Sequence, residues 1–177
     1  MMMFPRILSA AAQRRLQAHL KKGGLVAYPT ESCYGLGCVP TLPKALNQLI
    51  HLKKRPQHKG MIVIGHSLEQ LQPLLQRPSE NIQTMLHEAW PAPKTFLLPV
   101  GKKVLPSLRG KGRSKLAVRV PAHAGARRLC QVLEMPLVST SCNRAGKRAC
   151  KTEREVETKR SESTRLNSSH SAKSRMP

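Results

Sequence analysis

Residues 28–38 concentrate hydrogen-bonding groups directly after a short apolar run. Thr30 and Ser32 supply hydroxyls, Glu31 supplies a carboxylate, and two glycines follow. The apolar run is typical of a buried strand, and Pro29 marks its end because proline cannot donate to a sheet ladder. Open α/β sheets bind ligands in loops that leave the C-terminal ends of their strands. We therefore expect a ligand-binding loop here; the alternative is a polar turn whose glycines serve the backbone.

A basic cluster consists of Lys53, Arg55 and Lys59, between an expected helix and the next strand. A guanidinium offers a planar fork for phosphate oxygens, and an ammonium acts as a point charge. The cluster therefore predicts phosphate binding. The alternative is an ordinary solvated run of charge.

Small polar residues follow the strand expected at 136–140. Alternation along an extended chain points Ser139, Ser141 and Asn143 to the same side. These groups orient a ligand by hydrogen bonds, but hydroxyls are weak nucleophiles without an adjacent base. The pattern indicates binding rather than covalent catalysis, with a Ser/Asn turn as the alternative.

Arg119 is a charge inside the otherwise apolar strand expected at 116–120. A charge in such a strand is paired or faces a ligand, because burying it alone is costly. We expect either a ligand at Arg119 or an internal ion pair with a residue such as Glu31.

Alternating helices and strands must position these groups, and this alternation predicts an α/β sheet. Apolar runs predict strands at 25–27, 61–64, 95–98, 116–120 and 136–140. Helical periodicity and caps predict helices at 8–22, from Pro43 to Pro56, at 67–75, 79–90 and 122–133. Residues 101–115, with six Lys or Arg and no acid, are expected to form a loop.

The composition points to anionic partners. The net charge is +22, the nine acids are all Glu, and one Trp, two Tyr and two Phe are too few for a base-stacking platform. Without Asp or clustered His, we expect no metal held by the protein, so Mg²⁺ would be carried by substrate phosphates.

Five cysteines without a C-x-x-C pair, and no apolar run of about 18 residues, predict a cytoplasmic protein with reduced thiols.

Taken in order, these segments resemble the YrdC/TsaC family, the threonylcarbamoyl-AMP synthases. The likeness spans about residues 12–158, and its ordered spacing is specific. The matching motifs are Pro29-Thr30-Glu31-Ser32-x-Tyr34-Gly35-Leu36-Gly37, Lys53-x-Arg55-Pro56, Lys59-Gly60, Trp90-Pro91, Leu116-Ala117-Val118-Arg119-Val120 and Ser139-Thr140-Ser141-x-Asn143. The resemblance implies a YrdC-like twisted mixed sheet flanked by helices, with a concave basic cavity.

The resemblance also implies a nucleotidyltransferase in which L-threonine, bicarbonate and ATP give threonylcarbamoyl-AMP and pyrophosphate, for the t⁶A modification at position 37 of tRNA. It assigns L-threonine to Ser32, Arg119 and Ser139. It assigns ATP to Lys53, Arg55, Lys59, Ser141 and Asn143. Catalysis would then rest on positioning and charge neutralisation, with no catalytic nucleophile. A t⁶A transferase complex would act downstream, with tRNA or double-stranded RNA as a further partner.

We expect a YrdC-like domain at 1–159 and a disordered, adaptor-like tail at 160–177. Family members continue beyond the point where this tail begins, so the resemblance implies a C-terminally incomplete domain. Two other functions fit the sequence: a non-catalytic module that binds double-stranded RNA or tRNA through the 101–115 loop, or an inactive truncated product.

Overall fold

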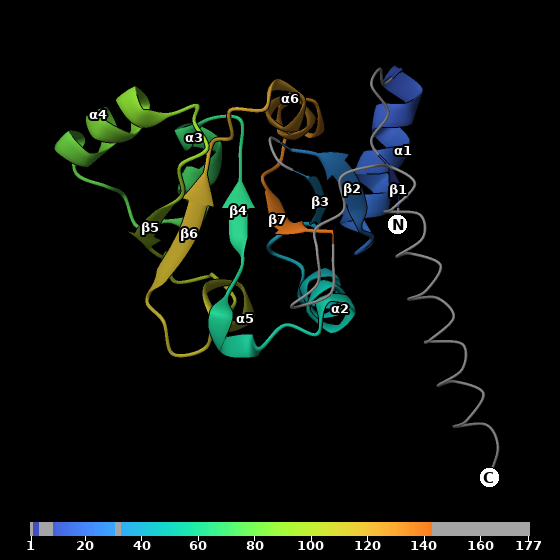
Figure 1. Ribbon diagram of the computed structural model, residues 1–177, viewed down its shortest axis with the longest axis horizontal. Helices are drawn as coiled ribbons and strands as arrows, with labels where there is room; N and C mark the ends of the chain where they lie inside the picture. Colours follow the sequence, from blue (N-terminus) through green and yellow to red (C-terminus); the bar gives the residue numbers. More distant parts are fainter. Residues whose placement is uncertain (1, 4–8, 31–32, 143–177) are drawn as a thin grey trace, which may run out of the picture.

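The computed structural model describes residues 2–3, 9–30 and 33–142. Within them, a seven-stranded sheet runs in the order β1-β2-β3-β7-β4-β6-β5 (Figure 1). The strands are β1 (Met2–Met3), β2 (Val26–Pro29), β3 (Tyr34–Gly37), β4 (Ile62–Ile64), β5 (Phe96–Pro99), β6 (Lys115–Arg119) and β7 (Leu137–Ser141). The β1/β2 and β4/β6 pairs are parallel and the other pairs antiparallel, so the expected mixed α/β sheet is confirmed.

Helices cover both faces of the sheet. They are α1 (Ala10–Lys21), α2 (Pro43–Lys53), α3 (Leu68–Leu71), α4 (Glu80–Ala89), α5 (Pro106–Arg109) and α6 (Ala124–Leu133), with 3₁₀ turns η1 (Gln57–Lys59) and η2 (Gln72–Leu74). Serines cap three of them: the hydroxyls of Ser9, Ser67 and Ser79 accept from backbone N–H groups of α1, α3 and α4, and the caps at Ser67 and Ser79 were expected from the sequence. No helix in the described part of the chain is long and apolar enough to cross a membrane.

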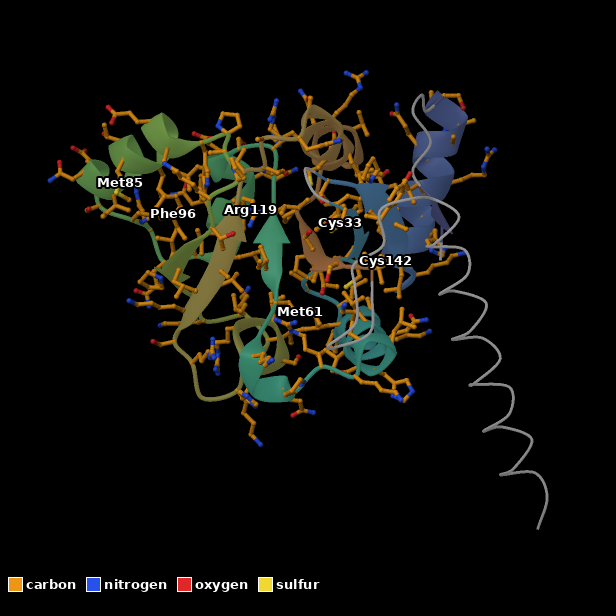
Figure 2. The ribbon with its side chains drawn as sticks, viewed as in Figure 1. Cys33, Met61, Met85, Phe96, Arg119 and Cys142 are labelled. Carbon is orange, nitrogen blue, oxygen red and sulfur yellow. The ribbon has the colours of Figure 1, made fainter. Side chains whose placement is uncertain are left out.

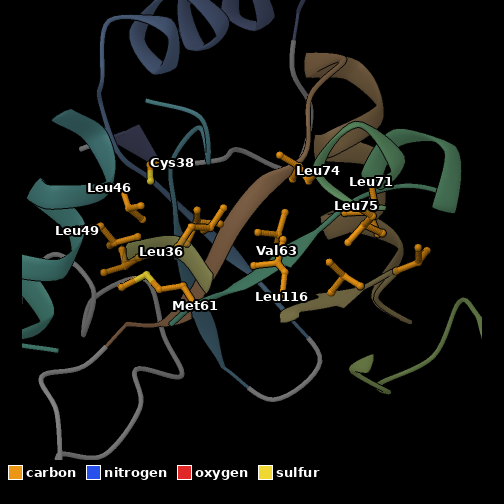
Figure 3. Packing of buried hydrophobic residues seen from close by; sticks show 14 of the residues in the cluster. Leu36, Cys38, Leu46, Leu49, Met61, Val63, Leu71, Leu74, Leu75 and Leu116 are labelled. Atoms are coloured by element: carbon orange, nitrogen blue, oxygen red, sulfur yellow. The ribbon is translucent and has the colours of Figure 1, made fainter. Parts of the chain in front are cut away.

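Two apolar clusters hold the layers together. On one face, Leu46 and Leu49 of α2 and Leu71 of α3 pack against Val63 and Leu116 of the sheet (Figure 3). On the other face, α1 and α6 pack against β2, β4 and β7. Helices α1 and α6 cover only part of this second face. Side chains that alternate onto it therefore remain available to line a cavity.

The prediction of a loop throughout 28–38 was wrong for Tyr34–Gly37, which form β3 as an antiparallel partner of β2. Glycine-rich segments are typical of turns, but here Gly35 and Gly37 lie on one face and leave space for the Tyr28 ring. In the strand order, β2 lies next to the edge strand β1 and is not central in the sheet.

Three other differences follow from proline residues and from a left-handed residue at a helix end. The expected 101–115 loop contains α5, which Pro106 starts at its first position. The helix expected at 67–75 is divided into α3 and η2, because Pro73 has no N–H to continue the ladder. Helix α2 ends at Lys53, before Pro56, because Lys54 adopts a left-handed conformation with φ of 50°.

Candidate functional site

A cavity of about 300 Å³ opens on the sheet face that α1 and α6 share. Its floor includes Gly35 of β3 and Ile62 and Ile64 of β4. The strand register places the polar groups: Ser141 lies opposite Gly35, Ser139 opposite Ile62, and Arg119 opposite Ile64. The polar residues in the lining are Thr30, Arg55, Arg119, Ser139, Thr140 and Ser141.

Arg119 lies on this face because β6 alternates. Leu116 and Val118 point into the opposite core, so the last residue of the strand points toward the cavity. Its Nε donates a hydrogen bond of 2.8 Å to Thr95 Oγ1 (Figure 2 labels Arg119). No carboxylate of a described residue pairs with it, and Glu31, the expected internal partner, lies outside the described residues. Thr95 is a supporting residue that the sequence did not reveal.

The end of α2 positions two of the expected phosphate-binding residues. Arg55 lines the cavity, and its Nε donates to the carbonyl of Gly60 at 2.8 Å. Partial burial lowers the pKa of the Arg55 guanidinium from its ordinary value. Lys53 is 4% exposed, and its Nζ donates to the Ser141 carbonyl at 2.6 Å. Lys59 is exposed on η1, and neither Lys53 nor Lys59 is part of the lining.

Close backbone packing fixes the segment that carries Arg55. The amide of Met61 donates to the carbonyl of Leu108 at 2.8 Å. Gly60 has φ of 65°, and a Cβ there would lie 2.6 Å from the Arg109 carbonyl oxygen. Only glycine fits this left-handed position against another backbone. The glycine next to the predicted Lys59 therefore has a structural function.

The two sides of the cavity come from segments far apart in the sequence. Figure 2 shows Arg119 and Cys33 on either side of β4. Ser139 and Ser141 both line the cavity, as the alternation predicted. Ser32 and Asn143 lie outside the described residues, and their assignments stay predictions. Thr30 was expected to supply a hydroxyl to a ligand-binding loop; its hydroxyl donates to the Cys33 carbonyl at 2.7 Å and so holds the β2–β3 turn.

The buried thiols are protonated, and therefore weak nucleophiles, near neutral pH. Burial raises the pKa of both Cys38 and Cys130 to about 12, so only about one in 10⁴ is a thiolate at pH 8. The described cysteines form no disulfide with one another. No group of three or more His, Cys or Glu side chains within 2–3, 9–30 and 33–142 is arranged to hold a metal ion. The charged residues in the described part of the cavity lining are Arg55 and Arg119, a composition suited to an anionic ligand.

Known proteins resemble this chain in both sequence and fold. A family model described as Sua5_yciO_yrdC, "Telomere recombination", matches residues 18–174. Threonylcarbamoyl-AMP synthase of Neisseria gonorrhoeae is 79% identical over 155 residues, covering 88% of this chain and 82% of that protein. The synthase of Chromobacterium violaceum is 47% identical over 150 residues, covering 85% and 77%.

Solved structures agree. P. abyssi Sua5 complexed with L-threonine superposes with a TM-score of 0.77 at 30% identity, over 88% of this chain and 46% of that one. E. coli YciO, at 24% identity, supports the fold with a TM-score of 0.72 over 90% and 77%. The chain thus spans less than half the length of the Sua5 structure and most of the length of its curated relatives. With a family model matched over most of its length, this chain belongs to the Sua5/YciO/YrdC family.

Proposed function

We propose that this chain is a threonylcarbamoyl-AMP synthase, which joins L-threonine, bicarbonate and ATP and releases pyrophosphate. The observation that carries the proposal is the cavity itself, whose lining brings together Arg55, Arg119, Ser139 and Ser141. The curated relatives named threonylcarbamoyl-AMP synthase, and the Sua5 structure with L-threonine, support the same assignment.

Arg119 is the natural partner of the L-threonine carboxylate. Its Nε is already bonded to Thr95, which orients the guanidinium plane. No described residue hydrogen-bonds to its two Nη groups, so they present a fork to a carboxylate. Ser139, and Ser32 in the adjoining segment, would supply hydroxyls to the same substrate.

The nucleotide would occupy the side of the cavity near Arg55, Lys53 and Ser141. Two cationic side chains at the end of α2 suit the negative charge of a triphosphate. Lys59 on the neighbouring η1 and Asn143 after β7 would extend this contact. Mg²⁺ would enter as part of the ATP substrate, because the chain has no Asp to hold it.

In the reaction, the amine of L-threonine and bicarbonate give a carbamate and water. A carbamate oxygen then attacks the α-phosphorus of ATP as pyrophosphate leaves. This transfer needs alignment of the substrates and neutralisation of charge rather than a protein nucleophile. Arginines, small hydroxyls and backbone groups in a cavity supply both. The product would serve the t⁶A modification of tRNA through a separate transferase.

The test is pyrophosphate release by the purified chain with ATP and Mg²⁺, with and without L-threonine and bicarbonate. We expect release only when both are present. The same sample is titrated with L-threonine and with ATP in a calorimeter. A folded chain that neither releases pyrophosphate nor binds these substrates would contradict the proposal and favour the alternative of an inactive product.

A second property, RNA binding, is favoured by the basic surface of residues 101–115. Lys102, Lys103, Lys111 and Arg113 are exposed, and the amide of Lys111 donates to the Gln57 carbonyl, which ties this surface to η1. Clustered cations without acids bind phosphate backbones and release counterions. We propose this surface as the contact for tRNA or double-stranded RNA.

We predict that Lys102→Ala/Lys103→Ala weakens binding of a labelled RNA duplex and reduces the slope of log K against log salt by about 2, because each lost phosphate contact contributes about 0.7–0.9. Fluorescence anisotropy at several salt concentrations measures both quantities. Lys21→Ala/Lys22→Ala, at the end of α1, is the matched control and should keep the original slope. Equal slopes for the two double variants would refute this surface.

A further inference from the structure

Tyr28 lies beneath the cavity, and its ring crosses a neighbouring strand. The residue belongs to β2, is fully buried, and lies opposite Gly35 of β3. A Cβ at Gly35 would lie 3.1 Å from Tyr28 Cζ, and a Cβ at Gly37 would lie 2.9 Å from Cε1. The ring therefore passes over β3 at the two positions where that strand has no side chain. Any other residue at Gly37 would also meet the Val138 carbonyl oxygen at 2.7 Å.

Beyond β3 the next strand is β7, and its Ser139 is the residue that the phenol approaches. The β3/β7 register pairs Gly35 with Ser141 and Leu36 with Thr140, which sets Gly37 against Ser139. Side chains directly opposite or diagonal on one face of an antiparallel pair are within reach of an aromatic ring. Tyr28 is directly opposite Gly35, and its ring reaches diagonally past Gly37 toward Ser139, which lines the cavity.

The Tyr28 hydroxyl is a buried donor with no partner at hydrogen-bond geometry among the described residues. Burial raises the pKa of this phenol well above its ordinary value, while the nearby Ser139 hydroxyl acts in the opposite direction. The phenol therefore stays protonated at every pH at which the protein is studied. A small rotation would bring the proton of the Tyr28 phenol to the Ser139 hydroxyl.

We propose that Tyr28 is a positioning residue that orients the Ser139 hydroxyl toward the ligand. When the phenol donates to Ser139 Oγ, the serine proton is left to point into the cavity. A carboxylate accepts hydrogen bonds and donates none, so this orientation favours the carboxylate of L-threonine. The inference rests on the proposed function, in which Ser139 contacts L-threonine. It also gives a reason for the two glycines in β3, since they let the ring pass.

The test uses Tyr28→Phe, which keeps the ring and removes only the oxygen. We expect the Kd of L-threonine, measured by calorimetry, to rise about five-fold, a typical effect of one neutral hydrogen bond. The Kd of ATP should stay within about two-fold, and the melting temperature should not fall, because the deleted hydroxyl has no partner in the described structure. A purely structural role would instead change both affinities together or lower the melting temperature.

A double-mutant cycle adds a second measurement. In a Ser139→Ala background, Tyr28→Phe should have no further effect on the Kd of L-threonine, because the phenol then has no serine to orient. Additive effects would overturn the inference, as would an unchanged Kd for Tyr28→Phe alone. If the unaltered chain itself does not bind L-threonine, the proposed function fails first, and this inference with it.

Discussion

Replacing Arg119 by lysine should weaken L-threonine binding on the order of 30-fold, or about 2 kcal/mol, although the positive charge is retained. The reason is geometric. The guanidinium donates to Thr95 through Nε and still has two Nη groups for the substrate carboxylate. An ammonium has one nitrogen, so a lysine cannot keep the Thr95 contact and also form a bidentate pair. Calorimetric titration with L-threonine measures the loss.

Two controls isolate this effect. Arg128→Lys changes an exposed arginine on α6 and should leave the Kd of L-threonine unaltered. Thr95→Val removes the acceptor for Nε but leaves the charge and the fork of Arg119, so a smaller loss of about three-fold is expected. If Arg119→Lys binds L-threonine as tightly as the unaltered chain, the carboxylate is not held by this guanidinium, and the threonine half of the site is wrong.

Arg119 could be identified from the sequence because one charge interrupts an apolar strand. Its partner could not be identified. Thr95 precedes β5, 24 residues away, and the two meet only because β5 pairs antiparallel with β6. Local patterns therefore indicate which side chain is unusual, whereas the sheet register determines what it contacts. The same register brings Ser139 and Ser141 to the cavity from a strand that the sequence did predict.

The glycines of β3 show a second limit of sequence reasoning. Glycine is common in loops, so Gly35 and Gly37 favoured a loop over a strand. In the fold they are strand residues, and the Tyr28 ring of β2 fills the space that their side chains would occupy. This is a tertiary contact that overrides local propensity. The segment does lie at the cavity, since Gly35 and Thr30 line it.

The basic cluster was predicted as a group, but its members differ in the structure. Helix α2 ends at Lys53, and the left-handed Lys54 turns the chain so that Arg55 faces the cavity while Lys59 is exposed. A sequence pattern leaves the last residue of a helix uncertain by one or two positions. That small difference decides which cation is buried.

Lys53→Met should weaken ATP binding on the order of 100-fold, the larger of the effects expected for the nucleotide half of the site. The ammonium of Lys53 is almost fully buried and donates to the carbonyl of Ser141 at 2.6 Å, which joins the end of α2 to the end of β7. If the nucleotide binds at the end of α2 as proposed, this buried cation would act on the triphosphate at low effective dielectric, where the attraction is strong. Methionine fills a similar volume without the charge.

The same substitution deprives the Ser141 carbonyl of this donor, so we also expect a stability loss of about 1–3 kcal/mol in urea unfolding. Lys54→Met, at the exposed neighbouring position, is the matched control for both measurements. The decisive comparison is between ligands, because loss of a folded cavity would weaken ATP and L-threonine alike. If Lys53→Met lowers the affinity for ATP selectively, its charge serves the nucleotide. Equal losses for both ligands would make Lys53 a structural tie between α2 and β7 instead.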